Sequence, residues 1–411
     1  MKATLIQPYY HNIWESIGLG YIGAYAKQHT DVELDFYQAY FDSDATILEN
    51  AKNSQIVAFS CTSPTFKHAV NLSKRLKELN PKVHILFGGT HVSSIGEEIL
   101  VENTSIDQIV IGEGEKAFCK IINGERSPIV QGFKPSFDQL VWPDRDLIKN
   151  HRTIDFCEKL VDKRIASFQA NRGCPFRCKF CSERAITGIF NRKTNPIRTR
   201  PIHDLLNEIT AVNEKYKLDY FKFVDATFDI SPEFVISFCK EKISKGINLE
   251  WECMLHATFV NEEMFYWLKE SNCNQVNIGC ESGSSKILKQ TNKGVTVEKI
   301  RKAFAWGKKH GVKRRAFLIL GTPEETEEDH QLTEDLLDEI KPDVIGFTIL
   351  CPYPGSDFYS SKFKDIDWSK TDEYSNTFWC TKNFTNQELK EKQEYFIKKY
   401  ENILCERQET K

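Results

Sequence analysis

Short apolar runs alternate with longer stretches of helical spacing along the first 125 residues. Helical spacing covers Glu15–Gln28, Phe66–Leu79 and Ser94–Val101. The apolar runs predict strands at Ala3–Gln7, Glu33–Tyr37, Gln55–Ser60, Lys82–Phe87 and Gln108–Ile111. Strands that alternate with helices over short connections predict a parallel sheet covered on both faces. We therefore expect an α/β domain at residues 1–125, flavodoxin-like or Rossmann-like, with its ligand at the carboxyl ends of the strands.

A second alternating series begins after a stretch without clear periodicity. Residues 126–163 contain Pro128, Pro135 and Pro143, and we interpret them as a linker between domains. The second series predicts six further strands, at Ile165–Ala170, Tyr220–Val224, Glu250–Leu255, Gln275–Ile278, Arg315–Leu320 and Val344–Leu350. Six strand–helix units in about 190 residues predict a partial (β/α)6 barrel at residues 164–355, because a complete barrel needs about 250. Residues 356–411 are charged and predict a small C-terminal helical region with a helix near Asn386–Tyr400.

Size and charge exclude several classes of protein. The chain has 411 residues, too many for one ordinary domain. Its 55 Lys and Arg nearly balance 58 Asp and Glu, so we expect no nucleic-acid partner. No apolar run approaches the roughly 20 residues of a membrane helix, and the first residues lack a secretory pattern. We expect a cytoplasmic protein that is soluble and has no membrane partner.

Three of the 13 cysteines stand apart from the rest. The other ten are scattered, and we interpret them as small buried hydrophobic residues. Cys174, Cys178 and Cys181 have the spacing C-x3-C-x2-C and directly follow the first strand of the expected barrel. Three thiolates in one loop can bind three irons of a [4Fe-4S] cluster and leave the fourth iron open. Zinc is the competing metal, although it would require a fourth Cys or His at a matching spacing. Chance packing of three cysteines is the remaining alternative.

With its lead-in Asn171-Arg172-Gly173, this motif resembles that of the radical S-adenosylmethionine (SAM) superfamily. The resemblance implies that the open iron binds the amino and carboxylate groups of SAM. It also implies that the reduced cluster cleaves SAM to a 5′-deoxyadenosyl radical, which abstracts a hydrogen atom. Phe180 matches the family's aromatic residue before the third cysteine and would pack near the adenine.

Further matches to the family fall at the ends of successive strands. Each of these residues alone is also an ordinary turn residue or a solvated charge, but together they follow one cysteine motif in order. The resemblance implies SAM contacts by Glu281 and Ser282, and an adenine border at Gly321 and Pro352. The candidate SAM-binding residues are Phe180, Asp225, Thr227, His256, Glu281, Ser282, Gly321 and Pro352.

One position departs from the family pattern. His256 stands on the third strand near the place where relatives usually carry an arginine. Either the SAM carboxylate is held differently here or another cation takes that role. A single histidine on a strand is also common as an ordinary core residue.

An α/β domain ahead of such a barrel resembles the cobalamin-binding subgroup, the class B radical SAM enzymes. Cobalamin domains often carry an Asp-x-His-x-x-Gly loop after the first strand. Here His11 lies in that region but outside that frame. A scaffold that binds no corrinoid is the alternative. The resemblance makes eight residues at strand ends candidates for cobalamin contacts: Ser60, Thr62, Ser63, Gly88, Gly89, Thr90, Gly112 and Glu113.

Two classes of reaction fit this combination of motifs. The first is cobalamin-dependent methylation of a carbon or phosphorus atom in a small molecule. The second is radical chemistry without methyl transfer, such as dehydrogenation, rearrangement, cyclisation or elimination, with or without cobalamin. A non-enzymatic sensor or scaffold is a third possibility. Reduction of the cluster implies an electron donor such as flavodoxin or ferredoxin. We interpret Lys313-Arg314-Arg315 as a solvated face, and the tail aromatics Trp368, Phe378 and Trp379 either as core or as a substrate cover.

Overall fold

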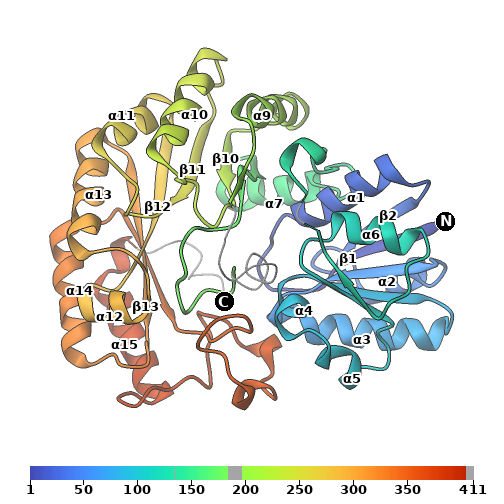
Figure 1. The fold of residues 1–411 in the computed structure, drawn as a ribbon. Coiled ribbons are helices and arrows are strands. Elements are labelled where there is room, and N and C mark those ends of the chain that lie inside the picture. Colours follow the sequence, from blue (N-terminus) through green and yellow to red (C-terminus); the bar gives the residue numbers. More distant parts are fainter. Residues whose placement is uncertain (134, 184–196, 404–411) are drawn as a thin grey trace. The chain divides into compact units, whose positions relative to one another are not determined.

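The computed structural model describes residues 1–133, 135–183 and 197–403, and the chain divides into two compact units (Figure 1). Both units contain parallel β-sheet and helices, so the expected α/β fold class is confirmed. The first unit comprises Met1–Asp162, Ser182–Arg198 and Tyr353–Lys370. The second unit comprises Lys163–Cys181, Thr199–Pro352 and Thr371–Lys411.

The first unit contains a six-stranded parallel sheet with the strand order β2-β1-β3-β4-β5-β6. Its strands are β1 (Lys2–Gln7), β2 (Glu33–Gln38), β3 (Ile56–Ser60), β4 (His84–Gly88), β5 (Gln108–Ile111) and β6 (Ile129–Gln131). In the register, Ala3 of β1 lies opposite Leu34 of β2 on one side and Ile56 of β3 on the other. The five strands predicted from apolar runs are all present.

Helices cover both faces of this sheet. One face carries α1 (Ile17–His29) and α6 (Glu115–Ile122). The other carries α2 (Asp44–Ala51), α3 (Ser63–Leu79), α4 (Thr90–Ile95) and α5 (Glu98–Glu102). A capping box between Thr62 and Thr65 and a proline in the first turn set the start of α3.

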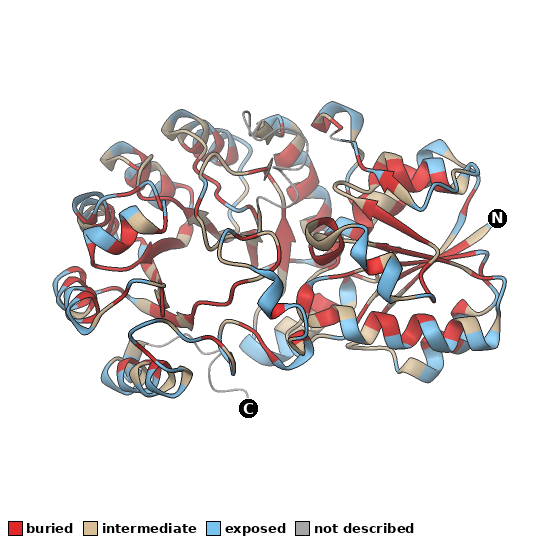
Figure 2. Ribbon diagram, turned by 60° about the horizontal axis from the view of Figure 1, so that its bottom comes forward, coloured by how far each residue is buried: buried red, intermediate tan, exposed pale blue. Residues whose placement is uncertain are grey.

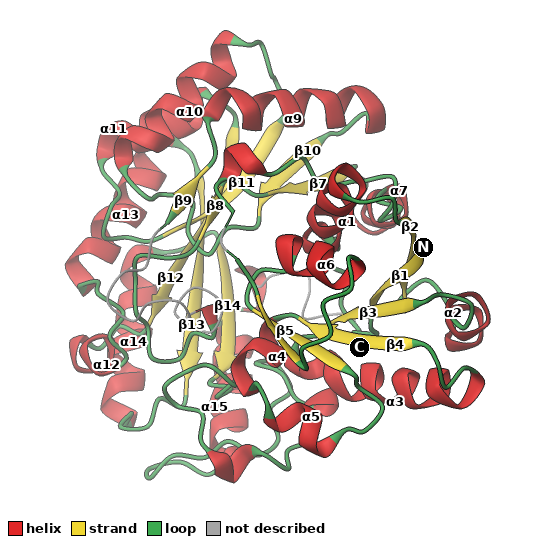
Figure 3. Cartoon of the chain, turned by 45° about the vertical axis from the view of Figure 1, so that its right-hand side comes forward, coloured by secondary structure: helices red, strands yellow, loops and turns green. Residues whose placement is uncertain are grey.

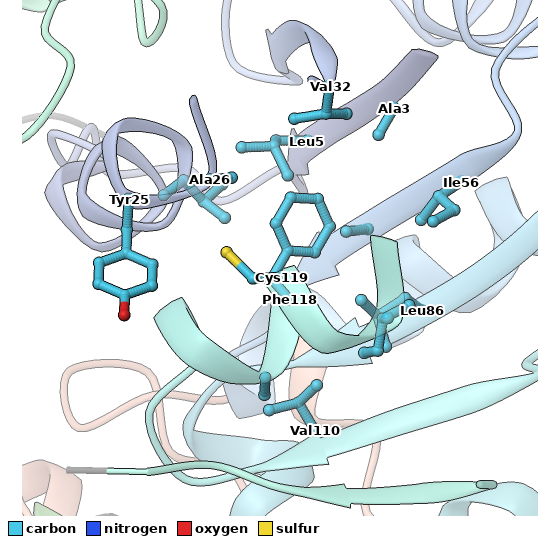
Figure 4. Packing of buried hydrophobic residues seen from close by; sticks show 14 of the residues in the cluster. Ala3, Leu5, Tyr25, Ala26, Val32, Ile56, Leu86, Val110, Phe118 and Cys119 are labelled. Atoms are coloured by element: carbon cyan, nitrogen blue, oxygen red, sulfur yellow. The ribbon is translucent and has the colours of Figure 1, made fainter. Parts of the chain in front are cut away.

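The apolar core of the first unit is split between these two faces. On the α1–α6 face, Leu5 and Leu86 from the sheet pack against Ala26 and Phe118 from the helices (Figure 4). Figure 2 shows the strands as buried and the outer sides of the helices as exposed. Each fully buried side chain of this size contributes about 1.5–3 kcal/mol, so the sheet is held firmly from both faces.

The segment expected to be a linker contains regular structure. β6 extends the first sheet, with Ile129 paired to Ile109 of β5, and a 3-10 turn covers Phe137–Gln139. Helix α7 (His151–Val161) follows. A three-residue strand is too short for alternation to show, and α7 buries only Thr153 and Ile154. The periodicity of the sequence is therefore faint here, although the backbone is ordered into elements.

The second unit contains a parallel sheet of six strands in the order β14-β13-β12-β11-β10-β7. Helices cover one face of this sheet (Figure 3), and we call the opposite face the inner face. The strands are β7 (Ile165–Phe168), β10 (Tyr220–Phe223), β11 (Glu250–Leu255), β12 (Cys273–Glu281), β13 (Lys313–Leu320) and β14 (Val344–Ile349). The helices are α9 (Ile202–Tyr216), α10 (Pro232–Ser244), α11 (Glu262–Glu270), α12 (Ser285–Gln290), α13 (Val297–His310) and α14 (Glu327–Ile340). Two very short strands, β8 (Asn171–Arg172) and β9 (Arg198–Thr199), complete the elements.

The C-terminal region does not form the single extension expected at residues 356–411. Tyr353–Lys370 belongs to the first unit, where Lys67 of α3 forms a 2.6 Å ion pair with Asp367. The chain then returns to the second unit, where α15 (Asn386–Lys399) packs on β14. Tyr353–Lys370 forms only short 3-10 turns around buried aromatic residues, which leave no periodic signal in the sequence. No helix in the described ranges is long and apolar enough to span a membrane.

Candidate functional site

The cysteine loop leaves the carboxyl end of β7 and is held at its start by a buried carboxylate. Asp225, which follows β10, accepts hydrogen bonds from the backbone N–H groups of Ala170 and Asn171. Gly173 has a φ of +95°, a conformation that favours glycine. The turn ahead of Cys174 is therefore set by one side chain and one glycine.

The rest of the loop is fastened to the turn that follows α12. The backbone N–H of Lys179 donates to the carbonyl of Thr291 at 2.9 Å, and the Asn292 side chain donates to the carbonyl of Arg177 at 2.9 Å. Within the loop, the N–H of Cys181 donates to the carbonyl of Cys178 at 3.2 Å. These backbone contacts place the loop beside Lys293, the next residue of the same turn.

Lys293 and Glu281 form a buried ion pair next to the cysteines. Their Nζ and Oε1 atoms are 2.6 Å apart, and each residue is only 7% exposed. Glu281 ends β12 with a φ of +60°, a strained value for a residue with a side chain. A Cβ added at Gly279 would lie 2.4 Å from the Glu281 carboxylate and 2.6 Å from the Lys293 ammonium. Gly279 is thus the residue that makes room for the pair.

The charges of this pair and of the thiols act on one another. Burial alone would lower the pKa of Lys293, but the Glu281 carboxylate outweighs it and raises that pKa. Burial raises the pKa of Cys178 to about 11. Its thiol therefore keeps its proton until a metal ion displaces it.

His256 lies in this site but does not supply the cation. Its ring stacks on Phe176 of the cysteine loop, with ring centroids 3.4 Å apart, and its Nε2 donates to the carbonyl of Lys293 at 3.0 Å. Burial lowers the pKa of His256 to about 3, so the ring is neutral at neutral pH. The buried cation beside the cysteine loop is Lys293. The sequence interpretation assigned it no role.

The side chains of Asp225 and Thr227 form hydrogen bonds with other protein groups instead of facing Lys293. Thr227 donates to Asp229, and Asp229 accepts the backbone N–H of His256 at 2.9 Å. Burial raises the pKa of Asp225 to about 8 and that of Asp229 to about 7. These side chains position the cysteine loop and His256.

Two further SAM candidates also have protein partners, and a third is buried. The Ser282 hydroxyl contacts Thr333 at 3.2 Å, and the carbonyl of Gly321 accepts a 2.6 Å hydrogen bond from the Trp379 indole. Pro352 is buried at the end of the second unit's barrel segment. The structure thus brings Phe180, His256 and Glu281 together around Lys293, whose Nζ lies 5.9 Å from the Phe180 ring centroid. Ser282, like Asp225 and Thr227, instead contacts other protein groups.

The candidates in the first unit lie at the carboxyl ends of β3, β4 and β5, and two of their hydroxyls are already engaged. Ser63 is within hydrogen-bond distance of His91 Nδ1 at 2.9 Å, with both residues buried. Thr62 takes part in the capping box of α3. Ser60, Gly88 and Thr90 are partly exposed at this edge.

The remaining candidates in the first unit have structural contacts of their own. Gly89 has a φ of +100°, and a Cβ there would lie 2.5 Å from the carbonyl oxygen of Cys61. Its missing side chain therefore allows close packing with Cys61. The backbone N–H of Gly112 donates to Ser93, and Glu113 forms an ion pair with Arg198.

The cysteines form no disulfide within the described ranges. In the same ranges, no group of three or more Cys, His, Asp or Glu side chains is spaced to hold a single metal ion. Outside the motif, most cysteines are buried, as expected for small hydrophobic residues.

Two family models match the chain, one in each unit. Residues 8–122 match the B12 binding domain, and residues 169–337 match the radical SAM superfamily. The second match includes the three cysteines, Glu281 and Lys293.

Curated relatives and solved structures match most of the chain. An uncharacterized methyltransferase of Pyrococcus horikoshii is 27% identical, over 83% of this chain and 76% of the relative. The anaerobic magnesium-protoporphyrin IX monomethyl ester cyclase of Rubrivivax gelatinosus is 23% identical, over 90% of this chain and 72% of the relative. The radical SAM methyltransferase TsrM from Kitasatospora setae, solved with tryptophan and a SAM analogue, shares the fold with a TM-score of 0.70 at 16% identity. That match covers 87% of this chain and 74% of TsrM, which has also been solved with cobalamin and a [4Fe-4S] cluster.

Proposed function

This chain belongs to the radical SAM enzymes that carry a B12-binding domain, and we propose that it is a cobalamin-dependent methyltransferase acting on a carbon or phosphorus atom of a small molecule. The observation that carries the proposal is the combination of the cysteine loop with the Glu281–Lys293 pair in the second unit and a B12-binding domain in the first.

The cysteine loop fits a [4Fe-4S] cluster with one open iron. It offers three thiols within eight residues, at the spacing C-x3-C-x2-C, and three thiolates in one loop can bind three irons and leave the fourth open. Cys178 is buried at this position, which shields a cluster from water. We assign Cys174, Cys178 and Cys181 as the ligands.

The ion pair beside the loop fits the polar end of SAM. We infer that the Glu281 carboxylate accepts hydrogen bonds from the SAM amino group. Lys293 binds the SAM carboxylate, in place of the arginine that relatives usually carry. An ammonium and a carboxylate 2.6 Å apart can exchange their mutual contact for the zwitterionic end of SAM without leaving a buried charge unpaired. Phe180 then faces the adenine. The ring of His256 positions Lys293 by donating a hydrogen bond to the Lys293 backbone carbonyl.

The carboxyl edge of the first sheet is the proposed corrinoid site. Ser60, Gly88 and Thr90 are partly exposed there, at the place where parallel sheets bind nucleotide-like ligands. No side chain of this edge is assigned to cobalt, because His11 stands outside the cobalt-binding frame.

The cofactors supply the reaction steps that protein side chains cannot perform: when bound, the reduced cluster cleaves SAM, and the corrinoid carries a methyl group to the substrate radical. The residues of the chain orient SAM, exclude water around Cys178 and hold the loop in place. An external one-electron donor such as flavodoxin or ferredoxin is part of the proposal.

A second candidate reaction is radical chemistry without methyl transfer. The similarity to an anaerobic cyclase over 90% of this chain favours it, since the cyclase name describes ring formation rather than methylation. In that case the first unit could bind cobalamin for another purpose.

The products formed from SAM separate the two candidates. The protein is reconstituted anaerobically with iron, sulfide and cobalamin, reduced, and given SAM, and the products are quantified by liquid chromatography and mass spectrometry. Methyl transfer yields both S-adenosylhomocysteine and 5′-deoxyadenosine. Formation of 5′-deoxyadenosine alone would overturn the methyltransferase proposal and favour the second candidate.

A further inference from the structure

The inner face of the second sheet carries side chains that neither the cysteine loop nor the ion pair uses. Along β13, Arg314 faces the helices, because its guanidinium donates to the carbonyls of Phe304 in α13 and Lys341 at the end of α14. Successive side chains of a strand point to opposite faces. Arg315 and Phe317 therefore lie on the inner face, where both are partly exposed.

The inner face is polar where a closed barrel would be apolar. In a complete (β/α)8 barrel, branched apolar side chains fill the interior. The strand register here places Lys222 beside Glu252, Glu252 beside Gln275, and Asn277 beside Arg315. Charged and amide groups on four adjacent strands are typical of a ligand-binding surface, because a packed core would leave them without water.

Arg315 forms no ion pair within the described ranges. Its guanidinium carbon lies 4.4 Å from the ring centroid of Phe317, and its Nε is buried without a hydrogen-bond acceptor. The Oδ1 of the neighbouring Asn277 accepts a hydrogen bond from Gln275 at 2.9 Å but none from the Nε of Arg315. Gly346 on β14 lies next to the guanidinium, since a Cβ there would be in ordinary contact with Nη2 of Arg315 at 3.6 Å. A buried donor without an acceptor costs free energy that an anionic ligand would recover.

Arg315 lies on the same face as the Glu281–Lys293 pair, because a Cβ at Gly279, which pairs with Phe317, would meet both charged groups. In the register, Leu318 pairs with Glu281, so the Cα of Arg315 is three residues, or about 10 Å, before that level. Its side chain reaches toward Phe317, which is on the way to the carboxyl end of the strand. An anionic group bound by Arg315 therefore leaves the rest of a small molecule directed toward the SAM site.

We propose that Arg315 binds the anionic group, a carboxylate or a phosphate, of the enzyme's small-molecule substrate. The apolar part of that substrate lies against Phe317 and Ile319, and its reacting atom lies near the level of Glu281. A guanidinium offers two parallel N–H donors that match either anion. This inference rests on the proposed function, because it takes the carboxyl end of the sheet as the place of reaction.

Binding of simple anionic probes to the reconstituted full-length protein tests the proposal. Two anionic probes are used, each with an uncharged control compound that we call its match. The match of 3-phenylpropanoate is its methyl ester, and the match of phenyl phosphate is phenol. Saturation-transfer NMR with competition gives the dissociation constants under anaerobic conditions with SAM bound. We expect at least one anion to bind about tenfold more tightly than its match. Which anion it is distinguishes a carboxylate substrate from a phosphate substrate.

Matched variants show whether Arg315 causes the tighter binding of the anion. Arg315→Gln should abolish the preference for the anion, and Arg315→Lys should restore part of it. Lys313→Gln removes the same charge from an exposed position on the same strand and should preserve the preference. Equal binding of anion and match, no anion binding, or a preference that survives Arg315→Gln would each overturn the proposal.

Iron content and SAM affinity are measured on the same samples. Arg315→Gln should leave both unchanged, since Arg315 contacts neither the cysteine loop nor the ion pair. If the wild-type protein bound no iron or no SAM, that result would contradict the proposed function itself. Failure of the proposed function can therefore be told apart from failure of the Arg315 proposal.

Discussion

The two parallel sheets of this chain are built alike, but their carboxyl ends differ in how polar groups are satisfied. In the first unit, Ser63 contacts His91 and Glu113 contacts Arg198, so its polar side chains already stabilise the fold. In the second unit, Glu281 keeps a strained backbone to meet Lys293 beside the cysteine loop. The comparison indicates that the second edge is organised for charged groups, whereas the first edge offers mainly backbone and small side chains to a ligand.

Loss of one cysteine should produce the largest difference between the two edges. Cys178→Ala removes a ligand from the second unit, and we expect loss of bound cluster iron and of all SAM cleavage. Iron and sulfide assays with product analysis measure both effects. The exposed Cys380→Ala is the control and should behave as wild type. SAM cleavage retained by Cys178→Ala would contradict the assignment of the loop.

Removal of the buried Lys293 cation should have the second-largest effect. Lys293→Met leaves Glu281 buried without a partner, which costs about 3–5 kcal/mol of stability. We also expect SAM affinity to fall at least about tenfold, because the carboxylate loses its cation. Equilibrium dialysis with labelled SAM and urea unfolding measure the two effects.

Two neighbouring substitutions sharpen this test. Lys289→Met removes the same charge from an exposed position of α12 and should leave SAM affinity unchanged. Lys293→Arg keeps the charge and should restore most of the affinity. If Lys293→Met bound SAM as wild type does, another group would have to hold the carboxylate.

In the first unit, the largest single effect should come from the backbone. Gly89→Ala places a Cβ 2.5 Å from Cys61 at a positive φ, and we expect a loss of about 2–4 kcal/mol. Gly18→Ala, in an exposed helical turn with open space around it, should be slightly stabilising. Urea unfolding of both variants measures the difference. Equal stability of the two would show that Gly89 is not required for packing against Cys61.

The smallest effect should be a difference in pH dependence. His256 has a folded-state pKa of about 3, below the value of about 6.5 expected in the unfolded chain. The unfolded state therefore binds the extra proton first, and the stability that neutral His256 contributes is lost as the pH falls below about 6.5. His256→Gln should thus lose less stability than wild type between about pH 7.5 and about pH 5. Identical pH dependence of both proteins in urea unfolding would contradict the burial of a neutral ring.

Much of the fold could be predicted because apolar periodicity reports burial. Five strands of the first sheet, the six strands of the second sheet and the position of the cysteine loop followed from that pattern. β6 could not be predicted, since three residues at a sheet edge carry too little alternation. The division of the C-terminal region between the two units also depends on tertiary contacts, such as Lys67 with Asp367, that no local pattern contains.

The site was predicted less completely than the fold. The motif predicts the cysteines and Glu281 as site residues, but residue type alone could not separate Lys293 from the many other lysines. The hold of Asp225 on the start of the cysteine loop could not be predicted, because its backbone partners lie 54 and 55 positions away in the sequence. Arg315 was interpreted as part of a solvated face, whereas the alternation of β13 places it on the inner face.

The most direct test of the whole account is the cofactor content of one sample. The protein is purified anaerobically, reconstituted with iron, sulfide and hydroxocobalamin, desalted, and assayed for iron, sulfide and corrinoid. We expect about four irons and about one corrinoid per chain. Four irons without corrinoid would contradict the role proposed for the first unit, and a chain without cluster iron would contradict the account as a whole.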